Sequence, residues 1–471
     1  MRHTARWCWI AICLVLAVIS FLGADLFQEH LAATDVSDID AVAAADEVVL
    51  GRRLSDMFKY HKDLWPLDAM DFVTLFFSAV GLIIAAGGGI GGGGILVPLY
   101  MILLKFRPKH AIALSNFTIF GGSIANTVFN VQKTDPRGRP LIDWDIIVIM
   151  EPSTIAGAVL GSFASKYLPD FVLTVALVIV LGMLSYRTMD KGISMFNKEN
   201  VEEEKQARKT AETEMAQNPE ETARLMPKPA APASTDVQSV PWNKIILLTL
   251  CFVGCVVMTI LKGSGHGSII GVVCGTPVFW VLSMATIPWV LLFGAGFRSM
   301  LVSEHEAKLK ANYQFRDGDI KWDANATIKY PLICSLAGVF AGLFGVGGGI
   351  VKGPLMLEMG VNPSVASATA AQMILFTTSA ACVSFVIFGL LEPGYGIVFF
   401  LMGLACTAVG QAGMNQWMKA AKRQSPPVLS IGIVMTLSTL LVAIEAVSKY
   451  LADAEDTSKL FKPSSICSKS D

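Results

Sequence analysis

Apolar segments of membrane-spanning length alternate with shorter polar stretches along most of this chain. An α-helix needs about 20 predominantly apolar residues to cross the hydrocarbon core of a bilayer. The pattern therefore predicts an all-α polytopic membrane protein. We expect about eight full spans, which in chain order are His110–Val131, Trp144–Ala164, Leu168–Tyr186, Ile245–Leu261, Thr276–Phe297, Ser364–Leu391, Pro393–Trp417 and Val428–Val447.

Two glycine runs interrupt this pattern, one in each half of the chain. The first reads GGGIGGGGILVP from Gly87 to Pro98, and the second reads GVGGGIVKGPL from Gly345 to Leu355. Each Gly costs roughly 1 kcal/mol relative to Ala inside a helix, so neither run is a stable helix interior. In a membrane, broken backbone is tolerated only where it is buried in protein or lines a cavity.

The segments around the two runs match each other. An apolar arm precedes each run, and a piece too short to cross the bilayer follows it. The arms are Asp68–Ala86 and Tyr330–Phe344, and the short pieces are Ile95–Leu104 and Ile350–Met359. Matching Gly/Pro-interrupted segments in two halves indicate the binding site of a secondary transporter. The alternative is that the small residues only allow close helix packing.

Loop charges predict how the two halves are oriented. Lys and Arg concentrate in the loops 132–142, 187–241, 298–325 and 418–425, whereas 165–169, 263–268 and 391–396 carry few. Basic loops face the cytosol, and all four share that side only if each glycine element is a re-entrant hairpin. We therefore expect two inverted repeats, residues 68–186 and 326–450, each with a Gly-rich broken or re-entrant helix element plus three spans.

The segments outside the repeats receive separate assignments. Residues 1–24 have a basic start, an apolar run and a small-residue end, which is typical of a signal peptide or an uncleaved first span. The other predicted segments are an extramembrane N-terminal segment (25–67), a charged, disordered cytosolic linker (187–241), two linking spans (242–297), a cytosolic loop (298–325) and a polar tail (451–471).

Composition agrees with a membrane protein and narrows the function. The chain is 53% hydrophobic and only 16% charged, against about 25% charged in soluble domains. The net charge of −1 gives no reason to expect a nucleic-acid partner. The nine cysteines include no C-x-x-C pair, and no nucleophile, metal cluster or acid–base pair stands out. We therefore expect no cofactor, no metal site and no enzymatic activity.

The glycine runs are the first candidates for binding chemistry. Neither is followed by Gly-Lys-Ser/Thr, so they are not nucleotide phosphate loops. Exposed N–H groups and the helix dipole at the start of each short piece favour a small oxyanion. Polar groups within spans are expensive, so several of them join the glycines as predicted substrate-binding residues: Gly92, Gly93, Gly94, Pro98, Ser115, Asn116, Gly347, Gly348, Gly349, Pro354, Thr369 and Gln372.

Three further residues are candidates for the proton or substrate path. Glu151 precedes Pro152 within a span, and it is either a proton carrier or a buried acid held by backbone groups that the proline frees. Lys352 beside the second glycine run either attracts the anion or extends to the cytosolic surface. Gln411 lies among glycines on the penultimate predicted span.

The same motifs resemble a known family. Gly92–Leu99 with Gly345–Leu355, and Ser115–Phe117, Gly121–Asn126 and Val365–Ala370, look like the TauE/SafE sulfite exporter family of membrane permeases. Ile142–Asp145, Val409–Gln411 and the long central loop resemble its eukaryotic, plant-type branch. The resemblance covers about residues 68–450. It implies a duplicated, proton-coupled transporter of sulfur-containing anions such as sulfite or organosulfonates, with the glycine motifs on the substrate path.

These observations together predict a secondary transporter of a small sulfur-containing anion. Its expected partners are that anion and the lipid bilayer of an endomembrane or the plasma membrane, and the oligomeric state is left open. Two rivals remain at this point. One is a passive anion channel built on the same hairpins, and the other is a non-transporting membrane scaffold with 187–241 as its working part.

Overall fold

The computed structural model describes residues 64–88, 92–134, 140–215, 241–263, 270, 272–311, 320, 322–345, 347–421 and 425–452. The predicted signal segment and nearly all of the two terminal segments lie outside these ranges. The elements within them are helices, with no β-strand in the described part of the chain. The predicted all-α polytopic membrane class is confirmed, because nine of the helices there are long and apolar enough to cross a bilayer.

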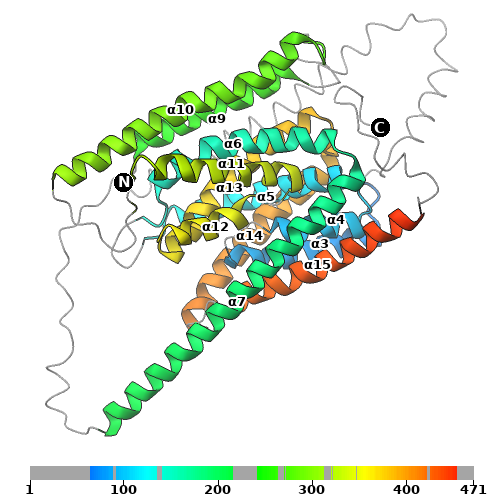
Figure 1. Cartoon of the computed structure of the whole chain (residues 1–471). Coiled ribbons are helices and arrows are strands. Elements are labelled where there is room, and N and C mark those ends of the chain that lie inside the picture. Colours follow the sequence, from blue (N-terminus) through cyan, green and yellow to red (C-terminus); the bar gives the residue numbers. More distant parts are fainter. Residues whose placement is uncertain are drawn as a thin grey trace, which may run out of the picture.

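The helices form one elongated bundle (Figure 1). In chain order they are α3 (Ala69–Gly88), α4 (Gly93–Ile102), α5 (Pro108–Asn130), α6 (Trp144–Tyr167), α7 (Asp170–Met215), α9 (Trp242–Lys262), α10 (Pro277–Lys310), α11 (Ala326–Phe344), α12 (Gly349–Glu358), α13 (Pro363–Ile387), α14 (Pro393–Ala421) and α15 (Ser425–Ala452).

The two predicted hairpin arms are longer than a hairpin requires. α3 has 20 residues and α11 has 19, which gives each a length of about 30 Å at 1.5 Å per residue. Both are among the nine helices that could span the membrane. The predicted count of about eight full spans did not include these arms. By length and hydropathy alone, the described ranges therefore contain more candidate spans than we predicted.

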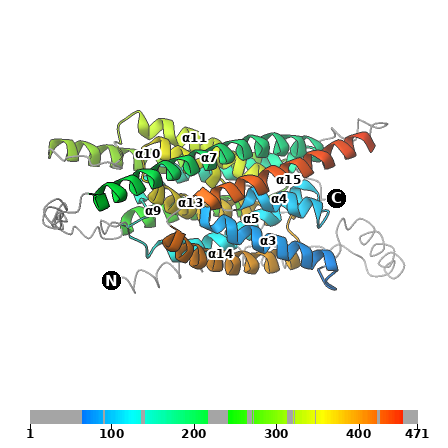
Figure 2. The same ribbon diagram turned by 90° about the horizontal axis from the view of Figure 1, so that it is seen from below.

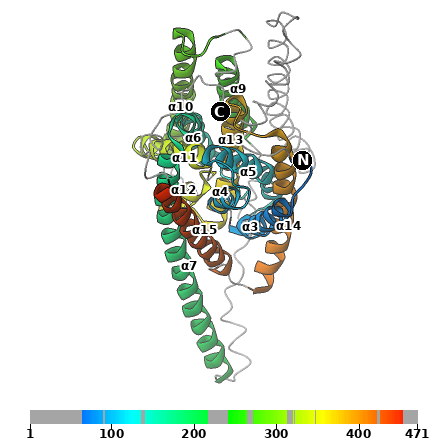
Figure 3. The same cartoon turned by 90° about the vertical axis from the view of Figure 1, so that its right-hand side faces the viewer.

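Two predicted polar segments are partly helical. The assignment of 187–241 to a disordered linker is wrong for residues 187–215, because the 46-residue helix α7 continues through them and extends beyond the bundle (Figures 1 and 3). This extension is rich in Glu and Lys, which are good helix formers. A helix already begun in the membrane also avoids the nucleation cost. Likewise, α10 includes residues 298–310 of the predicted loop 298–325.

The order of elements and their packing repeat between the halves. Each half contains a long helix, a glycine break, a ten-residue helix and three further helices: α3–α7 and α11–α15. α6 packs on α11 and α3 on α14, while α5 packs on α14 and α6 on α13. α5 meets α13, and α7 lies beside α15 (Figure 2). A two-fold relation between the halves would produce this exchange of partners. The inverted orientation itself stays a prediction.

The centre of the bundle is formed by α5 and α13. Within the apolar stretch of each helix, 83% of the residues are buried in α5 and 94% in α13, but only 17% in α10. α9 and α10 pack together and cover α6 from outside. α6 and α11 pack on α13, whereas α14 and α3 pack on α5. The ten-residue helix α4 contacts α5, and α12 contacts α13. Both glycine breaks are therefore attached to the central pair.

Small residues allow α6 and α11 to touch at their backbones. A Cβ added at Gly157 or Gly161 of α6 would lie 2.2 Å from a carbonyl oxygen of α11. One added at Gly338 or Gly342 of α11 would lie 2.1 Å from a carbonyl oxygen of α6. This is the close approach that glycine permits in membrane helix packing.

We expect Gly342→Ala to destabilise the protein by about 1–3 kcal/mol, the usual cost of overpacking a filled interior. The reason is that the helices must separate to admit the methyl group. The thermal midpoint of the purified protein measures the effect. Gly294→Ala on α10 is the control, because a Cβ there meets nothing within 4 Å and Ala favours a helix. Equal midpoints for the two variants would mean that the α6–α11 contact is not tight.

Candidate functional site

The two glycine breaks adopt backbone conformations that L side chains rarely take. Gly92, which precedes α4, has φ +77°. Gly345, at the end of α11, has φ +70°, and Gly347 and Gly348 before α12 have φ of +73° and +68°. Glycine reaches this left-handed region without a steric penalty. The breaks thus end α3 and α11 and start the short helices α4 and α12 inside the bundle. No side chain caps the N-terminus of α4.

The second break lies against helices of the first half. Ser115 of α5 donates a hydrogen bond of 3.0 Å to the carbonyl oxygen of Gly345. A Cβ at Gly345 would be 3.0 Å from the Ile112 carbonyl oxygen and 3.1 Å from Cγ2 of Val97 on α4. Because Val97 lies in the second turn of α4, the second break touches the short helix that follows the first break.

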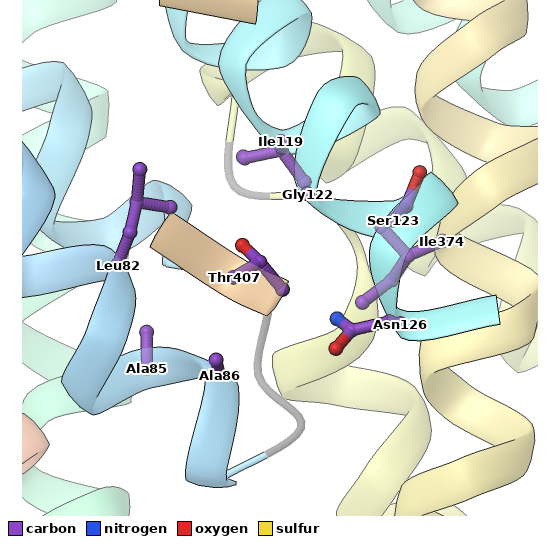
Figure 4. Close-up of a pocket in the computed structure, with 9 residues that line it drawn as sticks. All are labelled: Leu82, Ala85, Ala86, Ile119, Gly122, Ser123, Asn126, Ile374 and Thr407. Carbon is purple, nitrogen blue, oxygen red and sulfur yellow. The ribbon is translucent and has the colours of Figure 1, made fainter. Parts of the chain in front are cut away.

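A small cavity lies between α3, α5, α13 and α14 (Figure 4). Its volume is about 10 Å³, which holds about one water molecule. Nine residues of α3, α5, α13 and α14 line it: Leu82, Ala85, Ala86, Ile119, Gly122, Ser123, Asn126, Ile374 and Thr407. Ala86 comes directly before the first glycine run, and Gly347 of the second break contacts Ile119 and Ile374. The cavity therefore lies next to both glycine breaks, at Ala86 for the first break and at Ile119 and Ile374 for the second.

Several buried amide groups near the cavity lack a hydrogen-bond partner. The Oδ1 atoms of Asn116 and Asn126 and both polar atoms of the Gln372 side chain are unpaired. A buried polar atom without a partner costs about 1–3 kcal/mol. Asn126 lines the cavity, and its side chain extends toward Ala86 and Thr407 (Figure 4). Asn116 and Gln372 lie on the two central helices. Such groups are free to bind a polar ligand.

The other predicted binding residues have mainly structural contacts. Thr369 accepts a hydrogen bond of 3.0 Å from the backbone N–H of Asp143, the residue that caps α6. Pro98 is buried inside α4. A Cβ at Gly94 would face Met435 of α15 and Leu181 of α7. The remaining predicted glycines belong to the breaks or to the first turns of α4 and α12: Gly92, Gly93, Gly348 and Gly349. Pro354 lies in the second turn of α12.

Gln411 connects α14 to the first break. Its amide nitrogen donates to the carbonyl oxygen of Ala86 at 2.8 Å, and its amide oxygen accepts from Lys133 at 3.0 Å. Ala86 lines the cavity, so Gln411 holds one wall of it in place. Burial lowers the pKa of Lys133 below its usual value. Gln411 thus acts here by positioning Ala86.

Glu151 and Lys352 form an ion pair in the protein interior. Lys352 Nζ lies 2.9 Å from Glu151 Oε2, and both side chains have no exposed surface. Lys352 also donates to Thr377 Oγ1 at 2.8 Å, and the Thr377 hydroxyl donates to Glu151 Oε1 at 2.6 Å. The pair joins α12 to α6, with α13 completing the triad. Two earlier alternatives are therefore wrong: Lys352 does not reach the cytosolic surface, and side chains, not backbone, hold Glu151.

The sequence analysis missed this pairing although it named both charged residues. They are 201 positions apart, and local spacing gives no sign of contact at such a separation. One feature of the sequence could have predicted the pairing: the chain has one acid and one base inside apolar segments of opposite halves. Charges in a membrane interior pair with one another. In the described ranges, no three His, Cys, Asp or Glu side chains are grouped to hold a metal ion.

Comparisons with known proteins agree with this architecture. The family model described as Sulfite exporter TauE/SafE matches residues 73–255 and 222–439. The chain is 29% identical over 395 residues to Sulfite exporter TauE/SafE family protein 5 of Arabidopsis thaliana, covering 82% of this chain and 86% of that protein. It is 27% identical over 399 residues to family protein 2 of the same plant, covering 82% and 85%. No solved structure matches.

The two model matches together cover most of the helical bundle, including both glycine breaks, the cavity and the buried ion pair. They confirm the resemblance that the glycine motifs carried. This integral, multi-pass membrane protein belongs to the TauE/SafE sulfite exporter family.

Proposed function

We propose that this protein is a secondary transporter of small sulfur-containing anions, such as sulfite or organosulfonates, and that transport is coupled to protons. Relatives named as sulfite exporter family proteins support a permease role. The observation that carries the proposal is the pair of glycine breaks around one central cavity with unpaired buried amides. An interrupted helix in each half near a shared site is the arrangement of many secondary transporters.

The anion binds where the short helices begin. Backbone N–H groups in the first turn of a helix have no partner within the helix, and the dipole places a partial positive charge there. No side chain occupies this position at α4. The unpaired amides of Asn116, Asn126 and Gln372 add hydrogen-bonding groups from α5 and α13. Only backbone and neutral side chains then contact the oxyanion.

The cavity as it stands is too small to hold the anion. Its volume of about 10 Å³ fits about one water molecule and not a tetrahedral oxyanion. The anion enters when the cavity widens toward one membrane face. The left-handed glycines at 345, 347 and 348 are the backbone positions with the most conformational freedom, so they act as the hinges of this movement.

The Glu151–Lys352 pair links the anion to a proton. An anion entering the interior adds a negative charge, which is costly in a medium of low dielectric constant. If Glu151 takes up a proton at the same time, the charge of Lys352 is released to balance the anion. Lys352 lies in the first turn of α12, where a Cβ at Gly348 would be 3.7 Å from its Cε. The ammonium is therefore placed to attract an anion at the second break.

Uptake into proteoliposomes tests this function. The full chain is reconstituted, and flux of sulfite, sulfate, thiosulfate and ethanesulfonate is measured with and without an imposed pH gradient. We expect at least one of these anions to accumulate against its own gradient when the pH gradient is present, because a proton and an anion move together. Liposomes containing the double variant Glu151→Gln/Lys352→Met, which removes both charges of the buried pair, are the matched control, and they should show no uptake that responds to the pH gradient.

Two other outcomes would contradict the proposal. Flux that is unaffected by the pH gradient and never accumulates the anion indicates a passive channel. If the protein has a native-like thermal midpoint but transports none of the four anions, the result favours the scaffold. In the scaffold case the region 187–241 carries the activity. Deleting residues 216–240 then abolishes partner binding, whereas in a transporter the same deletion leaves flux intact.

A further inference from the structure

Three lysines are buried together at one end of the bundle. Lys109 is the second residue of α5, Lys166 lies in the last turn of α6, and Lys262 is the last residue of α9. Their exposed fractions are 8%, 4% and 4%. This end is opposite to the basic loops 132–142 and 187–241, so by the loop-charge rule it faces away from the cytosol. None of the three lysines belongs to the cavity or to the Glu151–Lys352 pair.

The contacts of these lysines within the described ranges leave the buried ammonium group of Lys166 without a hydrogen-bond partner. Lys109 Nζ donates to the carbonyl oxygen of Lys166 at 2.9 Å and lies 3.5 Å from the carboxylate of Asp170. The Nζ of Lys166 has no hydrogen-bond partner. Asp170, whose side chain is 37% exposed, is the carboxylate that pairs with the cluster in the described ranges. Lys109 thus pairs with a partly solvated acid, whereas the ammonium group of Lys166 is buried without a hydrogen-bond partner.

Aromatic rings form the other side of the cluster. Lys166 Nζ is 5.2 Å from the centroid of the Phe388 ring, and Lys262 Nζ is 5.7 Å from the same ring. Lys262 Nζ is also 4.9 Å from the ring of Phe163 and 5.9 Å from that of Phe279. Each cation–π contact stabilises an ammonium group by less than the cost of removing that group from water.

Helix dipoles account for only part of this arrangement. Lys166 and Lys262 lie at helix C-termini, where positive charge is favourable. Lys109 lies at the N-terminus of α5, where the same dipole is unfavourable for a cation. The N-terminal N–H groups of α5 add further positive character to the site. The electrostatics of the whole cluster therefore favour an anion.

We propose that Lys109, Lys166 and Lys262 form a second oxyanion site, which loads the transporter from the non-cytosolic side. An oxyanion of sulfur suits it, because several oxygens can each accept from a different ammonium group while the phenyl rings exclude water. The site is separate from the central cavity, since Lys109 and Ile119 are ten residues apart on α5, about 15 Å along the axis. The existence of the site does not depend on the proposed function, but its loading role and the identity of the anion as a sulfur oxyanion rest on it.

Thermal stability of the full-length protein in lipid nanodiscs tests the site without requiring transport. The thermal midpoint is measured in gluconate buffer and again at equal ionic strength with sulfate, thiosulfate or ethanesulfonate. We expect at least one of the three anions to raise the midpoint of the parent. The double variant Lys166→Gln/Lys262→Gln should need at least about tenfold more of that anion for the same rise, a loss of about 1.4 kcal/mol in binding.

Three further variants separate binding from folding effects. Lys166→Arg keeps the charge and should keep the response to the anion. Lys329→Gln removes an exposed lysine near Tyr330 on α11 and should also keep it. Lys166→Met in gluconate alone should melt at or above the parent temperature, because it removes an unpaired buried ammonium. A lower midpoint for Lys166→Met, with an unchanged anion response in the double variant, means that the lysines are structural.

Two results overturn the proposal: no tested anion shifts the midpoint of the parent, or the shift is the same in the double variant and the parent. Failure here is distinct from failure of transport. Uptake that persists in the parent without a lysine-dependent shift removes this site and leaves the transporter. A lysine-dependent shift without any uptake keeps the site and removes the transporter.

Discussion

We expect Gly347→Asn to reduce anion uptake in proteoliposomes to below about a tenth of the parent rate, a change of at least 1.4 kcal/mol in the free energy of binding or of the transport step. Gly347 has φ +73°, and Asn is among the non-glycine residues that best tolerate this conformation. The new Cβ would lie 3.4 Å from Ile119 and 3.8 Å from Ile374, which are ordinary contacts. The backbone can thus keep its shape.

The amide of the new side chain is what blocks transport. Both isoleucines line the central cavity, which has a volume of about 10 Å³, and an Asn amide there occupies the space that the anion needs. The variant should therefore fold and insert like the parent while losing uptake. Uptake is measured for both proteins after normalisation to the amount of protein with a native-like thermal midpoint.

Gly360→Asn is the matched control. Gly360 also has positive φ, +84°, but a Cβ there meets nothing within 4 Å. The same substitution at this position should leave uptake at the parent level. If Gly347→Asn transports as well as Gly360→Asn, the glycine runs serve only helix packing. The binding site would then have to be sought among Asn116, Gln372 and Gln411.

The features that local sequence determines were predictable. Glycine runs between apolar arms indicate broken helices, because an interior Gly is unfavourable in a helix and irregular backbone needs protein around it in a membrane. The ten-residue helices α4 and α12 follow these runs in the structure. The part of α7 that covers residues 187–215 was not predicted to be helical, since its dense charge is typical of disordered linkers. Local helix propensity, read across residues 187–215, would have corrected this.

Contacts between distant segments could not be predicted in the same way. The lysines at 109, 166 and 262 were each adjacent to a loop, where a solvated charge is the ordinary expectation, and only the fold brings them together. The surroundings of the Asn116 and Gln372 side chains could not be predicted from local sequence either. The sequence marked these side chains as costly within a span, but only the structure shows that Oδ1 of Asn116 and both polar atoms of the Gln372 side chain have no hydrogen-bond partner.

The largest effect on folding should come from separating Glu151 and Lys352. Removing one member of a fully buried ion pair leaves an uncompensated charge and costs about 3–5 kcal/mol. We expect Lys352→Met to destabilise the protein by that amount, because the Glu151 carboxylate keeps only the Thr377 hydroxyl as a partner. Glu304→Gln is the control: its side chain is 39% exposed where it pairs with Lys244. A surface pair of this kind contributes only about 0–1 kcal/mol.

The double variant Glu151→Gln/Lys352→Met separates stability from transport. Replacing both charges by neutral groups of similar size is often neutral for stability or favourable, so its thermal midpoint should return to near that of the parent. Its uptake should nevertheless be lost or no longer respond to a pH gradient, because no side chain remains to carry a proton together with the anion. A folded double variant that still accumulates anion with the parent's pH dependence would show that the pair only joins α12 to α6, and that the proton travels elsewhere.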